Sequence, residues 1–243
     1  MSHQRTNNAT EAEIDLTQIF ASGTFKNVWA GTYTKGERRG QACVSKEFKT
    51  GSVVEAHYFD EELHIIRRAQ EIIDHFHAAN IIRGRNIILN TPSIWTYTGG
   101  SRMGHKSLME PMIENFEKFN SNTGWTGRQT IWNDAIQALS HFSYHDSNRR
   151  FLLCDLQGGS YSDGYVLSDP VVMSQEQDCG PADLGPDGIR SFFLRHRCGR
   201  FCKHGWDKPE GTGRAAIPMR QGTSMGGHLG TRQSRNPLSR LQE

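Results

Sequence analysis

A cluster of histidine and cysteine near residue 200 constrains the fold more than any other sequence feature. His196, Cys198 and Cys202 supply three soft ligands within seven residues, a spacing typical of zinc. A closed tetrahedral site needs a fourth ligand. His141 is the best candidate, although a single histidine at a helix end is more often a capping or surface residue. The sequence therefore predicts a structural zinc site that joins two distant parts of the chain.

Composition and charge argue against several classes of protein. Lys and Arg number 28 against 26 Asp and Glu, so no overall field points to nucleic acid or to a membrane surface. The five cysteines are an odd number without a secretory signal, which favours a reducing compartment over a disulfide framework. No apolar run approaches the roughly 20 residues of a membrane span. We therefore expect a cytoplasmic protein with neither a membrane nor a nucleic-acid partner.

The first half of the chain predicts mostly strands and one long helix. Strands are expected within 19–29, where Gly23 forms a tight turn, and at 41–48, where Lys46 shares a face with apolar residues. Apolar residues recur at spacings of three and four over 53–76, which indicates a helix. Shorter strands are expected at 86–89, 93–97 and 107–109.

The second half alternates helices with segments that carry polar chemistry. Helices are expected at 128–142 and 185–196. Between them, an apolar run delivers Asp155 and Gln157 onto a glycine, and Leu-Ser-Asp-Pro then supplies Asp169. A glycine-bounded turn precedes the last helix.

Both ends of the chain are expected to be disordered. Residues 1–13 are polar and show no periodicity. Residues 206–243 are rich in glycine, mildly basic and poor in large apolar side chains. We therefore expect a chain that ends at Gly205 to keep its chemistry.

Taken in order, these motifs resemble those of the alpha-kinases. These atypical serine/threonine protein kinases include the myosin heavy chain kinases and elongation factor 2 kinase. The shared parts are a helix that ends in Ser-His, Asp-Leu-Gln-Gly, Leu-Ser-Asp-Pro, a glycine turn and His-x-Cys-x-x-x-Cys, and the resemblance covers 15–204. It implies a two-lobed α+β fold similar to that of protein kinases, with an N-lobe over 14–110 and a C-lobe with the zinc site over 111–205.

The resemblance implies ATP as the phosphoryl donor. Lys46 would neutralise the phosphates, although a lone lysine at a strand end is usually only solvated. Gly23 lies where the family has its phosphate-covering loop, and Glu62 on the long helix could pair with Lys46. The complete implied ATP-binding set is Gly23, Lys46, Glu62, Glu110 and Ile113.

Transfer to a protein serine or threonine also needs magnesium and a carboxylate directed at the acceptor hydroxyl. The resemblance places Asp155 and Asp169 in these two roles and Gln157 beside the magnesium ion. The sequence does not say which aspartate is the base and which the metal ligand. Two aspartates at strand ends that make only turn contacts are the alternative.

The glycine turn is where the family is thought to guide its peptide substrate, and Gly180, Asp183 and Gly185 are its candidate residues. Asp183 stands where the family commonly has asparagine, so its charge predicts a preference for basic peptides. Gly199, inside the zinc motif, likewise replaces a common asparagine without loss of a ligand.

One departure from the family concerns the link between the two aspartates. Residues 159–166 make it several residues longer than usual, and activity requires that this loop bulge outward so that Asp169 keeps its place. A catalytically inactive domain that binds nucleotide or a partner is therefore an alternative. A zinc-stabilised nucleic-acid-binding module is a second alternative, which the near-neutral charge disfavours.

Overall fold

The computed structural model describes residues 7–49, 55–211, 217–222 and 239–242, which fall into two compact units. The first unit combines Met1–Asp60, Asn90–Glu114 and Thr223–Glu243, and the second combines Glu61–Leu89 and Asn115–Gly222. The division thus differs from the expected boundary after residue 110. The long helix α1 (Glu55–Ala78) begins in the first unit and continues in the second, and the end of the chain returns to the first unit.

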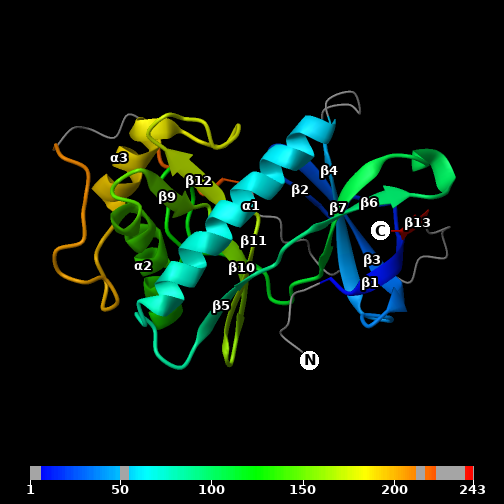
Figure 1. Cartoon of the computed structure of the whole chain (residues 1–243), viewed down its shortest axis with the longest axis horizontal. Coiled ribbons are helices and arrows are strands. Elements are labelled where there is room, and N and C mark those ends of the chain that lie inside the picture. Colours follow the sequence, from blue (N-terminus) through cyan, green and yellow to red (C-terminus); the bar gives the residue numbers. More distant parts are fainter. Residues whose placement is uncertain (1–6, 50–54, 212–216, 223–238, 243) are drawn as a thin grey trace. The chain divides into compact units, whose positions relative to one another are not determined.

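Strand pairing closes the sheet of the first unit into a ring (Figure 1). Its strands are β1 (Ala9–Ile14), β2 (Ala21–Ser22), β3 (Lys26–Gly36), β4 (Ala42–Phe48), β6 (Ser93–Tyr97), β7 (Lys106–Pro111) and β13 (Ser239–Gln242). The order in the described sheet is β1-β13-β6-β7-β4-β3-β2, and β1 also pairs with β3. Six strands therefore form a closed circuit, with β2 as an addition beside β3. Closure leaves few exposed strand edges.

Aromatic side chains and small residues fill the core of this unit. Trp95 is fully buried and packs against Tyr33 with ring centroids 5.9 Å apart. Ala9 and Ala12 of β1 are also fully buried. Their burial in this core explains why a segment that looks polar in the sequence forms a strand. Residues 9–13 thus differ from the expected disorder, because pairing with β3 and β13 decides their conformation.

The second unit packs helices against two small sheets (Figure 1). Its elements after α1 are β5 (Asn86–Leu89), β8 (Glu117–Lys118), α2 (Ile131–Asp146), β9 (Phe151–Cys154), β10 (Gln157–Tyr161), β11 (Gly164–Ser168), β12 (Val171–Ser174) and α3 (Gly185–Arg195). The described sheets have the orders β5-β11-β10-β8 and β12-β9. In the figure, α2 and α3 lie beside β9 and β12.

Helical periodicity explains how these helices pack. Ile66, Ile73 and Phe76 lie on one stripe of α1 and are buried in the main core of the unit. The helix α2 begins at Ile131, three residues later than expected, because the Thr130 hydroxyl accepts a hydrogen bond from the Asn133 amide and caps it.

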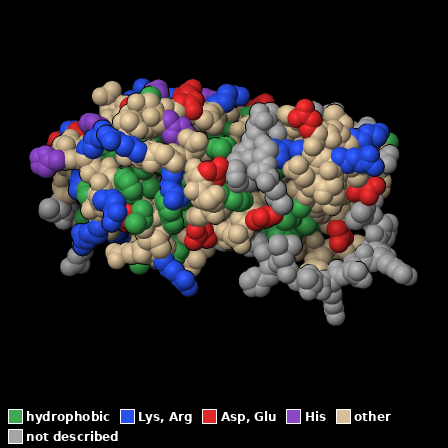
Figure 2. Space-filling model, turned by 90° about the horizontal axis from the view of Figure 1, so that it is seen from below, with side chains coloured by type: hydrophobic (Ala, Val, Ile, Leu, Met, Phe, Trp, Pro, Cys, Tyr) green, Lys and Arg blue, Asp and Glu red, His purple; other side chains and the backbone are tan. Residues whose placement is uncertain are grey.

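The surface carries both signs of charge. On the face drawn in Figure 2, Lys and Arg side chains are interspersed with Asp and Glu and do not merge into one basic region. Among the residues that the structure describes, no helix combines the length and apolarity needed to cross a membrane.

Candidate active site

Lys46 lies on β4 and forms a buried ion pair within the first unit. Its Nζ lies 2.7 Å from Glu110 Oε1, and the two side chains are only 3% and 4% exposed. Glu110 faces Val44 across the β4–β7 ladder, so Lys46, two residues further along β4, is its diagonal neighbour on the same face. Asn90 Nδ2 donates to the other Glu110 oxygen at 2.9 Å. This lysine is therefore not a solvated strand-end residue.

The turn at Gly23 joins β2 and β3 in the same unit. Its amide donates to the Lys26 carbonyl at 2.8 Å, and Lys49 Nζ donates to the Gly23 carbonyl at 2.6 Å. The turn thus has its own hydrogen bonds and a lysine beside it, which sequence reasoning missed. Of the other ATP-site candidates, Glu110 and Ile113 belong to this unit, whereas Glu62 belongs to the second.

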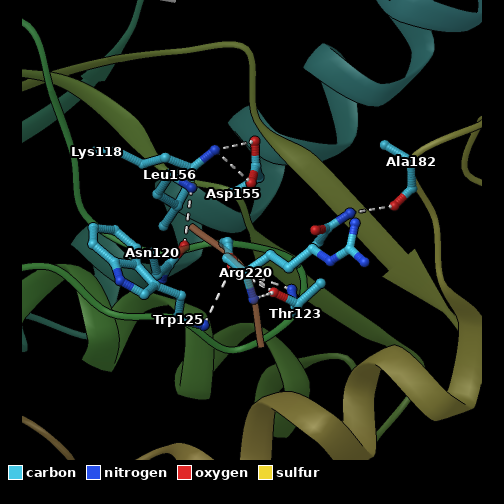
Figure 3. Close-up of polar contacts among 10 residues, drawn as sticks. Lys118, Asn120, Thr123, Trp125, Asp155, Leu156, Ala182 and Arg220 are labelled. Atoms are coloured by element: carbon cyan, nitrogen blue, oxygen red, sulfur yellow. Dashed lines mark hydrogen bonds and ion pairs between the residues drawn. The ribbon is translucent and has the colours of Figure 1, made fainter. Parts of the chain in front are cut away.

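Asp155 follows β9 in the second unit and faces a lysine that the sequence analysis did not single out. Lys118 Nζ lies 3.0 Å from Asp155 Oδ1, and the lysine side chain is 2% exposed (Figure 3). The Asn122 backbone amide donates to the Asp155 carboxylate, and Asn120 Oδ1 accepts from the Leu156 amide at 2.9 Å. Asn120 and Asn122 therefore hold in place the segment that carries Asp155.

Two opposing effects act on the Asp155 carboxyl. Burial raises its pKa, and the ammonium of Lys118 opposes that rise. The charge of Asp169 raises the pKa further, which indicates that the two aspartates lie close enough to interact. Both adopt left-handed backbone conformations, with φ of 56° at Asp155 and 48° at Asp169. Strained backbone of this kind clusters at functional sites.

The long link between the aspartates forms a hairpin that extends outward. Gln157 at the start of β10 pairs with Ser168 at the end of β11, and the ladder continues to Tyr161 and Gly164. The added residues lengthen the far end of this antiparallel pair and leave its base in register. Asp155, Gln157 and Asp169 are therefore brought together at the base of one hairpin, as an outward bulge required.

Asp183 has a different environment from the one its sequence position predicted. Its carboxylate accepts from the amides of Ser174, Cys179 and Gly185 at 2.8–3.1 Å, and also from the Ser174 hydroxyl at 2.7 Å. The residue is only 2% exposed. These hydrogen bonds satisfy the buried carboxylate, so its charge gives no reason to expect a preference for basic peptides. Gly180 and Gly185 have φ of 85° and 61°, which favours glycine at both positions.

The four predicted zinc ligands converge. His141, His196, Cys198 and Cys202 place their ligand atoms within 4.8 Å of one another. Cys198 Sγ lies 3.6 Å from His141 Nδ1, and Cys202 Sγ lies 3.6 Å from His196 Nε2. A tetrahedral zinc ion with bonds of about 2.3 Å to sulfur and about 2.1 Å to nitrogen separates such atoms by about 3.6 Å. The donor set therefore fits zinc.

Burial keeps both zinc-site imidazoles neutral. It lowers the pKa of His141 to about 4 and that of His196 to about 3, and a neutral imidazole is the form that binds metal. His141 Nε2 donates to the Asp207 carbonyl at 3.0 Å. Such a bond fixes the tautomer that leaves Nδ1 available as a ligand.

Trp206 and Asp207, which follow the zinc motif, contact the residues around the site. The sequence analysis did not single them out. The Trp206 ring packs edge-on against His141, with centroids 5.3 Å apart. The Asp207 carboxylate contacts His145 Nδ1 at 2.7 Å and Arg149 Nη2 at 2.6 Å. The expected disorder from residue 206 onward therefore does not describe this segment, because its contacts are with the zinc region itself.

Comparisons with known proteins identify the family of the chain. The sequence model of the alpha-kinase family matches residues 21–202. The alpha-protein kinase vwkA of Dictyostelium discoideum is 34% identical over 117 residues, which cover 44% of this chain and 19% of that protein. The eukaryotic elongation factor 2 kinase of Mus musculus is 33% identical over 97 residues, which cover 39% of this chain and 13% of that protein. The chain thus matches a fifth or less of the length of these curated relatives.

Solved structures show a similar fold. The alpha-kinase domain of myosin heavy chain kinase A, in a complex with AMP, aligns with a TM-score of 0.63 and 18% identity, over 79% of this chain and 88% of that one. An alpha kinase from Entamoeba histolytica aligns with a TM-score of 0.66 and 18% identity, over 88% of this chain and 84% of that one.

Proposed function

Because this chain belongs to the alpha-kinase family, we propose that it transfers the γ-phosphoryl group of ATP to a serine or threonine of a protein. The observation that carries the proposal is the grouping of Asp155, Gln157 and Asp169 at the base of one hairpin, with Lys118 beside Asp155. Phosphoryl transfer depends on positioned charges of this kind.

We assign to Asp155 the role of orienting the acceptor hydroxyl and accepting its proton. Its carboxylate is held by the Lys118 ammonium and the Asn122 amide, which fix its direction. A carboxylate already paired with an ammonium is a poor ligand for a cation, whereas it can still orient a hydroxyl and accept its proton. Its raised pKa favours proton acceptance.

We assign magnesium to Gln157 and Asp169, which offer the hard oxygen ligands that this ion prefers. Bound there, magnesium would neutralise charge on the phosphates. Lys46 would bind the phosphates of ATP. For this, its ammonium would have to contact the phosphates in addition to Glu110 or in place of it. Zinc would be held by His141, His196, Cys198 and Cys202 in a structural role, since four protein ligands leave no open position.

Radiolabelled ATP with a mixed histone substrate and a phosphoamino-acid readout tests the proposal. Asp155→Asn and Asp169→Asn should each lower the rate by about 100-fold or more, since each removes a group that acts on the reacting atoms. Asp163→Asn is the matched control, because Asp163 is exposed at the far tip of the same hairpin.

The wild-type rate decides between the kinase and the inactive, partner-binding alternative. Phosphoserine or phosphothreonine that disappears in both aspartate variants supports the kinase. If wild type binds ATP but transfers nothing, the domain is a nucleotide-binding or partner-binding one.

A further inference from the structure

A short segment of the tail, Ile217–Gly222, is bound to the second unit through its backbone. The Arg220 amide donates to Thr123 Oγ1 at 2.8 Å, and the Arg220 carbonyl accepts from Thr123 Oγ1 at 2.8 Å and from Ser121 Oγ at 2.7 Å. The Ile217 carbonyl accepts from Arg195 Nη2 at 3.0 Å, and the Ile217 amide donates to Ser191 Oγ at 3.4 Å. We call this segment the strap.

The side chains of the strap contribute little to its binding. Residues 218–222 are all exposed, and Met219 is 55% exposed. In the described part of the chain, the hydrogen bonds of the strap are all made by its main chain. Its binding surface therefore selects a peptide backbone of a suitable course and tolerates many sequences.

The same surface supports the proposed catalytic aspartate. Ser121 and Thr123 bind the strap, and Asn122 between them donates its amide to Asp155. Asn122 Nδ2 also donates to the Ala182 carbonyl of the glycine turn at 3.0 Å (Figure 3). One loop thus joins the strap, the aspartate and the turn.

The strap also leads toward the reacting groups. A Cβ atom on Gly222 would lie 3.3 Å from Lys118 Nζ, and that ammonium lies 3.0 Å from Asp155. A chain that follows the strap therefore arrives beside the carboxylate that we assign to the acceptor hydroxyl. A protein substrate has to make the same approach.

We propose that the surface formed by Ser121, Thr123, Ser191 and Arg195 binds the backbone of the acceptor protein, and that the strap occupies it in competition with that protein. This proposal rests on the proposed kinase function. It implies an autoinhibited chain in which the tail must leave before a substrate binds. Recognition through the main chain suits such an exchange, because it gives either occupant the same hydrogen bonds.

Arg220→Pro in the full chain tests the proposal. Proline removes the amide that donates to Thr123, whereas Arg220→Ala keeps that amide and removes only the side chain. With histone as substrate, Arg220→Pro should lower KM about two- to tenfold and leave kcat unchanged, as loss of one hydrogen bond predicts. Hydrogen exchange over 119–127 should become faster in this variant. Arg220→Ala should match wild type in both measurements.

Each other outcome is equally informative. Faster exchange with an unchanged KM would show that the strap docks without competing, and equal effects of proline and alanine would show that the side chain holds it. Either result overturns the proposal, as does unchanged exchange. If neither wild type nor the two variants transfer phosphate, the kinase proposal fails. Histone binding then tests whether the strap competes with a protein for this surface. Tighter binding by Arg220→Pro then supports the strap as competitor, and equal binding overturns it.

Discussion

Each of the two units holds a lysine–carboxylate pair, and the pairs differ in how they are enclosed. Lys46 and Glu110 lie on adjacent strands of a closed ring, 2.7 Å apart, and both side chains are almost completely buried. Lys118 and Asp155 lie 3.0 Å apart, but Asp155 stands at a strand end with a left-handed backbone and keeps 18% of its side chain exposed.

Because Lys46 and Glu110 are almost completely buried, we expect their pair to contribute more to stability than the Lys118–Asp155 pair, in addition to the ATP-binding role that we propose for Lys46. A fully buried pair cannot lose one partner without leaving an uncompensated charge. A pair at a strained strand end can reach an incoming hydroxyl while the lysine still balances its charge. Similar atoms at similar distances therefore predict different responses to substitution.

The largest effect is expected at Lys46. Lys46→Ala leaves Glu110 buried and unpaired, so the chain should lose about 3–5 kcal/mol of stability. Urea unfolding followed by circular dichroism measures this loss. Lys46→Met combined with Glu110→Gln removes both charges and should recover most of it. An alanine variant with wild-type stability would show that the two pairs are alike after all.

At Lys118 the loss of stability should be smaller than at Lys46, and the pH dependence of catalysis should change as well. Lys118→Met removes a hydrogen-bonding partner of Asp155 and should cost about 1–3 kcal/mol at neutral pH. Without the ammonium, the pKa of Asp155 rises further. The acid limb of the kcat profile should therefore move to higher pH. The stability loss should shrink as pH falls through the carboxyl range, where Asp155 becomes neutral. Lys118→Arg should largely restore both properties.

A moderate effect is expected where the tail meets the zinc region. Asp207→Ala removes the contacts to His145 and Arg149 and should lower the free energy of unfolding, with faster loss of zinc to a chelator. Glu210→Ala is the control, since that side chain is 93% exposed and 3.6 Å from Arg149. If the two variants behaved alike, the segment from residue 206 would be dispensable, as the sequence predicted.

The smallest effect is expected at an exposed pair between α1 and α2. Asp146 raises the pKa of His75 through a hydrogen bond and its charge. A raised folded-state pKa contributes stability below about pH 6.5 that is lost as pH rises through that higher pKa. His75→Gln should therefore lower stability by only about 0.2–0.5 kcal/mol below pH 6.5, and by nothing measurable at alkaline pH. Thermal unfolding at several pH values checks this sign.

Local pattern and motif order predicted much of the molecule. The periodicity of apolar residues located α1, and the strands 86–89 and 93–97 were predicted with the bounds that the structure shows. The convergence of His141 with the His196–Cys202 motif also followed from the sequence. These features are short-range, or are fixed by chemistry that only a few residues can perform.

Long-range pairing accounts for what the sequence did not predict. Little in the local sequence marks Ala9–Ile14 as a strand, because two of its buried residues are alanines, one is Glu11, and its partner β13 lies at the other end of the chain. The sequence analysis gave Lys118 no role, since only the fold brings it to Asp155. Asp183 was expected to face a substrate, yet its carboxylate is surrounded by the amides of Ser174 at the end of β12, of Cys179 and of Gly185 at the start of α3.

The ring of the first unit has a consequence for synthesis on the ribosome. Its circuit is completed by Ser239–Gln242, whereas the second unit consists of Glu61–Leu89 and Asn115–Gly222. The second unit of the nascent chain can therefore assemble before β13 has been synthesised and can pair with β1. Loop closure across most of the chain slows the last pairing step. Until then the unpaired edge of β1 is available for pairing with a wrong strand.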